Sequence, residues 1–271
     1  MSMLRSDTVF SGQIPEIYDQ LMVPMIFAPY ANDMATRVAA LGPARVLETA
    51  AGTGVVTRAM AHALPAHAEI VATDLNRAML DRAASNPVDR PVTWQQANAL
   101  QLPFDDASFD AVVCQFGAMF FPDKAAAFAE ARRVLKSGGA LLFNVWDRIE
   151  ENEFADTITG ELSRLFPADP PRFMERTPHG YFDLELVSRD LAEAGFDAPR
   201  FDTVTARSHA ASARAVAIAY CQGTPLRGEI ESRSGANLEE ATSACAAAIE
   251  ARFGSGLIDG KIQAHVITVP R

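Results

Sequence analysis

Short apolar runs alternate along the chain with amphipathic stretches of helical periodicity. The runs that predict strands cover residues 44–49, 69–73, 92–95, 109–114 and 140–145, and helical patterns cover residues 55–64, 77–84 and 123–135. Near-continuous apolar strands separated by helices indicate a parallel sheet that is covered on both faces. The sequence therefore predicts an α/β fold with a doubly wound sheet and right-handed crossovers.

Two regions do not follow this alternation. Residues 13–41 look helical, whereas residues 148–183 carry aromatic and proline residues in an irregular context. Because ligands bind outside the carboxyl ends of parallel strands, we expect both regions to form a lid. The remaining patterns predict helices at 183–194, 212–220 and 238–252, and strands at 200–207 and 262–269. The helix over residues 123–135 is expected to end in a glycine cap at Gly138 and Gly139.

Composition excludes several classes of protein. Hydrophobic residues make up 49% and charged residues 21%, which is ordinary for a globular chain. A net charge of −10 disfavours binding to nucleic acid or to an anionic membrane. The three cysteines form no Cys-x-x-Cys pair, which suits a reducing compartment. Since neither a secretory signal nor a transmembrane run is evident, the expected location is the cytoplasm.

The strongest local signal is a glycine-rich turn between the first strand and the first helix of the alternation. Its spacing is Glu48-x-Ala50-x-Gly52-x-Gly54, and Asp74 ends the second strand twenty residues later. Glycines allow the backbone to approach a ligand closely, and a carboxylate after the second strand can accept both hydroxyls of a ribose. The glycine-rich turn and Asp74 together therefore predict a cofactor that contains an adenine nucleoside.

Charge separates the candidate cofactors. Glu48, just before the turn, would repel the pyrophosphate of a dinucleotide but attract the sulfonium and ammonium groups of S-adenosylmethionine. The third glycine position of the dinucleotide pattern is occupied by Thr57. S-adenosylmethionine is thus the favoured cofactor. An NAD-dependent oxidoreductase and a non-catalytic S-adenosylmethionine-binding module are the alternative hypotheses.

Several motifs together resemble the class I S-adenosylmethionine-dependent methyltransferases. They are the turn at 48–54, Asp74-Leu75, Ala97-Asn98-Ala99, the segment 109–112 and the segment 133–140. The nearest branch is the one that acts on small molecules and includes the ubiquinone and menaquinone C-methyltransferases. The resemblance implies a Rossmann-like sheet of seven strands, mostly parallel, with a C-terminal antiparallel hairpin and helical lid segments. It also implies one domain over residues 1–271, comprising an N-terminal helical lid (1–43), a cofactor-binding core (44–147) and a third segment (148–271) with further lid residues, the last helices and the C-terminal strands.

The resemblance assigns roles to individual residues. Glu48 and the turn would bind the methionine end, Asp74 the ribose, Leu75 the adenine face and Asn98 the adenine edge, with Gln115 near the transferred methyl group. The full expected cofactor set is Tyr18, Glu48, Ala50, Gly52, Thr53, Gly54, Asp74, Leu75, Met79, Asn98, Ala99, Leu100 and Gln115. Two residues depart from the family. Ala50 replaces a usual glycine, so its φ should be negative, and Asn98 replaces a frequent aspartate.

Catalysis is expected to depend mainly on alignment, because the sulfonium already activates the methyl group for direct displacement. The acceptor is expected to be a small molecule whose reacting atom is oxygen, nitrogen or carbon, and the product is S-adenosylhomocysteine. A general base is needed only if the acceptor loses a proton, and His179 is the candidate, with loop packing as the alternative. Tyr18 and Tyr30 either reach the ligands or pack in the core. No metal site is predicted, and a monomer and a homodimer both remain open.

Overall fold

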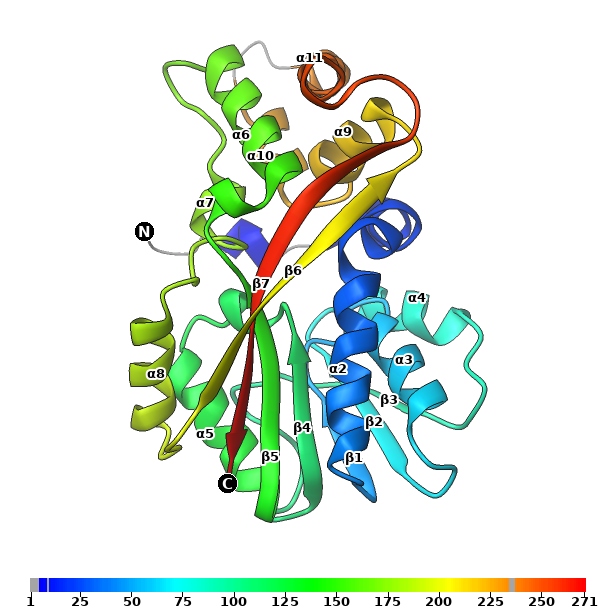
Figure 1. The fold of residues 1–271 in the computed structure, drawn as a ribbon, viewed down its shortest axis with the longest axis vertical. Helices are drawn as coiled ribbons and strands as arrows, with labels where there is room; N and C mark the ends of the chain where they lie inside the picture. Colours follow the sequence, from blue (N-terminus) through cyan, green and yellow to red (C-terminus); the bar gives the residue numbers. More distant parts are fainter. Residues whose placement is uncertain (1–4, 9, 234–236) are drawn as a thin grey trace. The chain divides into compact units, whose positions relative to one another are not determined.

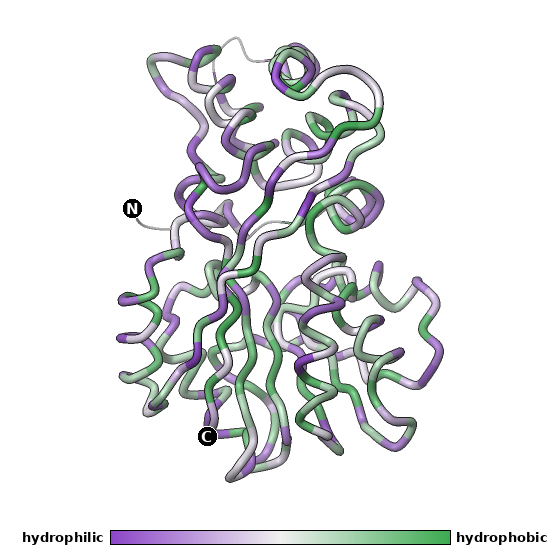
Figure 2. Tube along the Cα trace, viewed as in Figure 1, coloured by the Kyte–Doolittle hydropathy of each residue, from purple (hydrophilic) through white to green (hydrophobic). Residues whose placement is uncertain are grey.

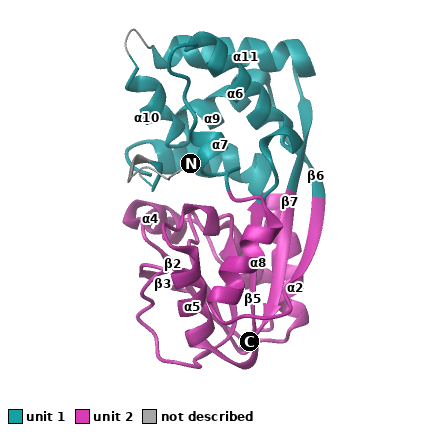
Figure 3. Ribbon diagram, turned by 90° about the vertical axis from the view of Figure 1, so that its left-hand side faces the viewer, with its two compact units in different colours: residues 1–27, 146–180, 205–263 teal, residues 28–145, 181–204, 264–271 magenta. Residues whose placement is uncertain are grey.

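The computed structural model describes residues 5–8, 10–233 and 237–271. The chain forms two compact units, coloured separately in Figure 3. Unit 1 comprises the described residues of Met1–Phe27 together with Trp146–Gly180 and Thr205–Gln263. Unit 2 comprises Ala28–Val145, Tyr181–Val204 and Ala264–Arg271. The single domain with its three segments stays a prediction.

A seven-stranded sheet organises the fold. Its strands are β1 (Arg45–Glu48), β2 (Glu69–Asp74), β3 (Thr93–Gln96), β4 (Phe109–Gln115), β5 (Leu135–Trp146), β6 (Arg200–Ala210) and β7 (Ile258–Pro270). The order is β3-β2-β1-β4-β5-β7-β6, and the first five strands of the chain pair in parallel. Strand β7 runs opposite to its neighbours (Figure 1). The predicted seven-stranded, mostly parallel sheet with a C-terminal antiparallel hairpin is confirmed.

Unit 2 contains five α-helices among the described residues. They are α2 (Ala28–Ala40), α3 (Val55–Ala63), α4 (Arg77–Ser85), α5 (Lys124–Val134) and α8 (Leu184–Glu193), with a short 3₁₀ turn, η3 (Ala118–Phe120), before α5. Of these, α3, α4 and α5 connect parallel strands. Right-handed crossovers on either side of β1 place α3 and α4 on one face of the sheet and α5 on the other. Met34, Met60, Val46 and Ile70 belong to the buried core, and Figure 2 shows the hydrophobic character of the central strands.

Unit 1 is mainly helical. Its helices are η1 (Arg5–Thr8), α1 (Ile14–Ile17), the π-helix η2 (Tyr18–Phe27), η4 (Ile149–Glu151), α6 (Glu153–Leu165), α7 (Phe173–Arg176), α9 (Ala213–Gln222), α10 (Leu226–Glu231) and α11 (Leu238–Phe253). Helix α6 corrects the prediction of an irregular stretch over residues 148–183. Phe154, Ile158 and Leu162 recur every four residues and are buried along one face, and the prolines begin only after the helix has ended.

The predicted glycine cap after α5 is wrong. Helix α5 ends at Val134, and Leu135, the residue after it, is already extended and begins β5. Gly138 adopts a φ of +80° inside that strand. The β4–β5 register shifts between the pairs Phe109–Leu135 and Ala111–Ala140, so the glycine lies in an irregular part of the strand rather than at a helix end.

Gly160 offers a simple gain in stability. It lies within α6, and a Cβ added there would meet no atom within 4 Å. Gly160→Ala should raise the free energy of unfolding by about 0.5–1 kcal/mol, because alanine loses less backbone entropy in a helix. Urea unfolding followed by circular dichroism measures this. Gly180→Ala is the matched control and should destabilise, since its Cβ would lie 2.1 Å from the carbonyl oxygen of Arg176.

Candidate functional site

The turn that follows β1 is fixed by neighbouring strands. The N–H of Thr49 donates to the carbonyl oxygen of Val113 at 2.9 Å, and the N–H of Ala51 donates to that of Thr73 at 2.9 Å. Gly52 has a φ of +57°, and a Cβ there would meet only the terminal methyl of Met79, at 3.7 Å. Gly54 leaves no room for a side chain, because a Cβ there would lie 2.8 Å from the Trp94 ring. The turn is therefore rigid, and its backbone is open at Gly52.

Ala50 corrects the prediction of a negative φ. Its φ is +52°, in the left-handed region. The hydrogen bonds of Thr49 and Ala51 fix the residues on both sides, so Ala50 adopts the conformation that glycine usually supplies. Its methyl group is accommodated because Gly117 has no side chain: a Cβ on Gly117 would lie 2.4 Å from the Ala50 Cβ. The turns after β1 and β4 thus interlock through these two residues.

This contact predicts coupled mutational effects. Gly117→Ala should lower the free energy of unfolding by about 1–3 kcal/mol, the usual effect of overpacking a tight site. In an Ala50→Gly background the same change should have a smaller effect, because the Ala50 methyl is gone. A double-mutant cycle measured by chemical denaturation gives this coupling. Equal effects of Gly117→Ala in both backgrounds would contradict the interlock.

Glu48 is a buried acid at the end of β1. The Thr57 hydroxyl donates to its Oε2 at 2.5 Å, and 1% of the residue is exposed. Burial raises the pKa of Glu48 to about 8, although the Thr57 hydrogen bond and the nearby Arg58 charge oppose the shift. The carboxyl group is thus neutral near pH 7 and is readily ionised by a nearby cation.

Asp74 joins the turn to the end of β2. Its Oδ2 accepts the Gly52 N–H at 2.8 Å, and its Oδ1 accepts the Asn76 N–H at 2.7 Å. The Asn76 side chain and the Leu75 N–H also donate to this carboxylate, so a ligand hydroxyl would compete with or replace one of these contacts. Burial raises the pKa of Asp74, and the backbone hydrogen bonds oppose that shift. The next residue, Leu75, is 54% exposed, which leaves an apolar side chain beside the carboxylate.

The other core residues of the predicted set lie at the same edge of the sheet. Asn98 follows β3, and its Oδ1 accepts the N–H of Leu100 at 3.0 Å, so the oxygen expected to meet adenine already closes a local turn. Ala99 lies between these two residues. Gln115 is the last residue of β4 and is partly buried. Since β3, β2, β1 and β4 are consecutive in the sheet, their carboxyl ends bring these residues together with the turn and Asp74.

The remaining candidates are described by their own surroundings. In unit 1, the Tyr18 ring packs 5.1 Å from that of Phe27 and 6.0 Å from that of Phe10, between centroids. In unit 2, Tyr30 is 1% exposed, and its hydroxyl donates to the carbonyl oxygen of Val204 at 3.0 Å. Both tyrosines therefore have packing partners.

His179 is a buried histidine of unit 1. Its Nδ1 lies 2.8 Å from the carbonyl oxygen of Asp147, so Nδ1 bears the proton and Nε2 the lone pair. The ring packs 6.1 Å from that of Trp146, between centroids. Burial lowers the pKa of His179 to about 4, so the imidazole is neutral at pH 7. Its role as a base stays a prediction.

Sequence reasoning missed Thr57 and Asn144. Thr57 stands where a dinucleotide-binding fold has glycine, and its hydroxyl is the hydrogen-bond partner of Glu48. Asn144 lies in the apolar run of the fifth strand, and its carboxamide accepts the N–H of Phe116. A single amide inside an apolar strand was the available signal, because buried polar groups require partners.

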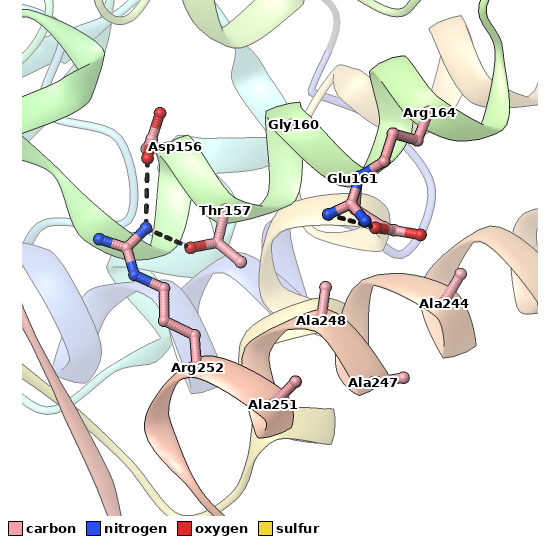
Figure 4. Close-up of a pocket in the computed structure, with 10 residues that line it drawn as sticks. All are labelled: Asp156, Thr157, Gly160, Glu161, Arg164, Ala244, Ala247, Ala248, Ala251 and Arg252. Carbon is pink, nitrogen blue, oxygen red and sulfur yellow. Dashed lines mark hydrogen bonds and ion pairs between the residues drawn. The ribbon is translucent and has the colours of Figure 1, made fainter.

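A separate groove of about 750 Å³ lies in unit 1, between α6 and α11 (Figure 4). Ala244, Ala248 and Ala251 line it from α11. Two ion pairs border it: Asp156 with Arg252 at 3.2 Å, and Glu161 with Arg164 at 3.0 Å.

Within the described part of the chain, no group of three or more His, Cys, Asp or Glu residues is arranged for a metal ion. Among those same residues, no helix is long and apolar enough to cross a membrane.

Comparisons with known proteins agree with this geometry. A family model described as a methyltransferase domain matches residues 47–143. The ubiquinone/menaquinone biosynthesis C-methyltransferase UbiE of Marinomonas sp. (strain MWYL1) is 30% identical over 173 residues, which cover 59% of this chain and 69% of that one. The YcgJ protein from Bacillus subtilis has a similar fold, with a TM-score of 0.54 and 20% identity over 90% of this chain and 98% of that one. Phosphoethanolamine N-methyltransferase 2 of Haemonchus contortus, solved with phosphomonomethylethanolamine and S-adenosylhomocysteine, has a TM-score of 0.56 and 15% identity over 95% of this chain and 56% of its own.

Proposed function

Because the chain belongs to the class I S-adenosylmethionine-dependent methyltransferases, we propose that it methylates a small-molecule acceptor by direct displacement at the sulfonium. The single observation that carries the proposal is the rigid turn at 49–54 flanked by the buried acids Glu48 and Asp74. A turn open at Gly52 accepts a ligand, and Glu48 is suited to a cationic ligand. The product of the transfer is S-adenosylhomocysteine.

The residues present fit this cofactor. Thr53 is buried in the turn, and its hydroxyl has no hydrogen-bond partner within residues 5–8, 10–233 and 237–271. An unpaired buried hydroxyl beside an open backbone is suited to a polar ligand. Exposed Leu75 offers an apolar face, which a planar base can cover.

We assign the roles within the site as follows. Glu48 and the turn bind the methionine end, with Gln115 nearest the reacting methyl group. Asp74 binds the ribose. The adenine-binding side chains are those of Leu75, Asn98, Ala99 and Leu100, and Met79 and Tyr18 are the remaining residues of the proposed cofactor set. When bound, the cofactor supplies the activated methyl group, and these residues bind and orient it.

For the acceptor, we propose a class of compound, a small molecule. A net charge of −10 supports a small molecule rather than a nucleic acid or an anionic membrane surface. The three cysteines, which are free and buried, suit the reducing cytoplasm. The matched curated relatives are C-methyltransferases by name, and we retain carbon, oxygen and nitrogen as acceptor atoms. The proposed function is compatible with a monomer and with a homodimer.

Calorimetry with S-adenosylmethionine, and with NAD as the control ligand, tests the cofactor. We expect saturable binding of the first and none of the second. Mass spectrometry of reactions with a deuterated methyl donor then tests panels of phenols, amines and carbon acids for the labelled methyl group. Binding of NAD without S-adenosylmethionine would favour an oxidoreductase instead.

The proposed base has its own test. If the acceptor must lose a proton, Nε2 of His179 is the atom that accepts it, because Nδ1 is engaged by Asp147. His179→Ala should then slow turnover of the identified acceptor while leaving S-adenosylmethionine binding intact. Unchanged turnover would remove His179 from the mechanism and leave it as a packing residue.

A further inference from the structure

Asn144 is a buried amide among apolar residues at the end of β5. It is 0% exposed, and its neighbours Phe143 and Val145 are equally buried. The register of the sheet pairs Asn144 with Gln115, the last residue of β4. Asn144 therefore lies at the carboxyl end of the sheet, beside the residue that the proposed function places nearest the reacting methyl group.

One half of the amide stabilises the turn that follows β4. Its Oδ1 accepts the N–H of Phe116 at 2.9 Å, and the main-chain oxygen of Asn144 lies 3.2 Å from the same nitrogen. Phe116 has a φ of +51°, a left-handed conformation that a bulky residue adopts only where its surroundings impose it. Asn144 supplies both acceptors and so stabilises this strained conformation.

Packing fixes the other side of the same turn. A Cβ on Gly117 would lie 2.4 Å from the Ala50 Cβ and 2.8 Å from the Cys114 Sγ. The Phe116 ring meets the Tyr30 ring edge-on, with 5.3 Å between centroids. These contacts restrict the backbone of the turn that immediately follows Gln115.

The NH₂ half of the amide makes no stabilising polar contact among the described residues. Its Nδ2 is buried and has no hydrogen-bond partner in the part of the chain that the structure describes. Leucine has the same number of side-chain heavy atoms and the same branching, and it would leave no buried donor unpaired, so an apolar residue would suit the strand better. Backbone strain and an unpaired buried donor at one place are typical of functional sites.

We propose that Asn144 is a positioning residue for methyl transfer, which fixes Phe116 in the left-handed conformation and thereby directs Gln115 toward the methionine end of the cofactor. The proposal rests on the proposed function. In that function the adenosine half of the cofactor is bound from β2 and β3, by Asp74 and Asn98. Loss of Asn144 therefore weakens recognition of the methionine half alone.

Two ligands separate the two halves in a direct experiment. S-adenosylhomocysteine contains both, whereas 5′-methylthioadenosine lacks the amino acid. By calorimetry, Asn144→Leu should bind the first about tenfold more weakly, the effect of one hydrogen bond, and the second within about twofold of the wild type. Equal changes for both ligands, or no change, would overturn the proposal. A wild type that binds neither ligand would overturn the proposed function itself.

A matched pair of second-site variants tests the backbone argument. In the Asn144→Leu background, Phe116→Gly and Phe116→Ala both remove the ring, but only glycine adopts a positive φ freely. Phe116→Gly should recover affinity for S-adenosylhomocysteine, and Phe116→Ala should not. Equal affinities would show that Asn144 does not act through the turn. If Asn144→Leu does not fold, the same changes in affinity for the two ligands are expected of Asn144→Ala.

Discussion

Asp74→Ala should reduce the affinity for S-adenosylmethionine by at least about 100-fold. Hydrogen bonds to a charged group are each worth roughly 1.5–3 kcal/mol, and a ribose offers two hydroxyls to the carboxylate. The change also removes the acceptor of the Gly52 N–H, which stabilises the open point of the turn. Calorimetry at pH 7.5 measures the loss.

The matched control for Asp74 is Asp81→Ala. Asp81 lies on α4, where its side chain is 60% exposed and pairs with Arg77. Because exposed pairs contribute little, this variant should bind the cofactor as the wild type does.

A 2′-deoxy analogue of S-adenosylhomocysteine separates the ribose contact from damage to the turn. It should bind more weakly than the parent compound to the wild type but equally to Asp74→Ala. A variant that keeps wild-type affinity would contradict the ribose assignment.

The sheet and the cofactor turn were predictable because both follow from local pattern. Apolar runs end at Glu48, Asp74 and Gln115, and parallel strands place their carboxyl ends at one edge. The glycines at 52 and 54 identify a tight turn with no reference to the rest of the chain. The parallel sheet and its glycine turn therefore needed no tertiary information. The C-terminal hairpin came from the family resemblance, as did the roles of the site residues, which stay predictions.

Other features depend on residues far apart in the sequence. The φ of Ala50 is positive because strands β2 and β4 fix its neighbours, and Gly117 makes room for its methyl group. Gly138 resembles a helix cap locally, yet the register with β4 places it in an irregular part of the strand. In the sequence Asn144 is one more residue of an apolar strand, and only the structure shows that its side chain accepts the N–H of Phe116. Local pattern carries no information on any of these contacts.

Helix α6 was missed for a different reason. The neighbouring aromatic and proline residues weighed more than the four-residue spacing of Phe154, Ile158 and Leu162. The prolines at 167, 170 and 171 all follow the helix, so they end the pattern without breaking it. The four-residue apolar period therefore predicts a helix that ends before the first of these prolines.

Glu48→Gln should remove a pH dependence from cofactor binding. In the free protein the pKa of Glu48 is raised to about 8, so the wild type binds a cation by first losing this proton. Wild-type affinity should therefore rise between pH 6 and pH 8, by up to about tenfold per pH unit, with proton release. Calorimetry in two buffers of different ionisation enthalpy measures the released proton. Glu48→Gln should release none, show little pH dependence and bind more weakly at pH 8.

The same carboxyl group should govern the stability of the free protein. Its pKa rises on folding from 4.5 to about 8, so the folded state retains the proton that the unfolded state has lost. Stability from this group is complete below pH 4.5 and falls as the pH rises to 8. The wild type minus Glu48→Gln difference in unfolding free energy, followed by urea denaturation across this range, should show that fall. Thr57→Val removes the hydrogen bond that opposes the shift, so the fall should begin at the same pH but extend to a higher one. A difference curve that stays flat would mean that Glu48 is ionised in the free protein, and that the cofactor meets a carboxylate already charged.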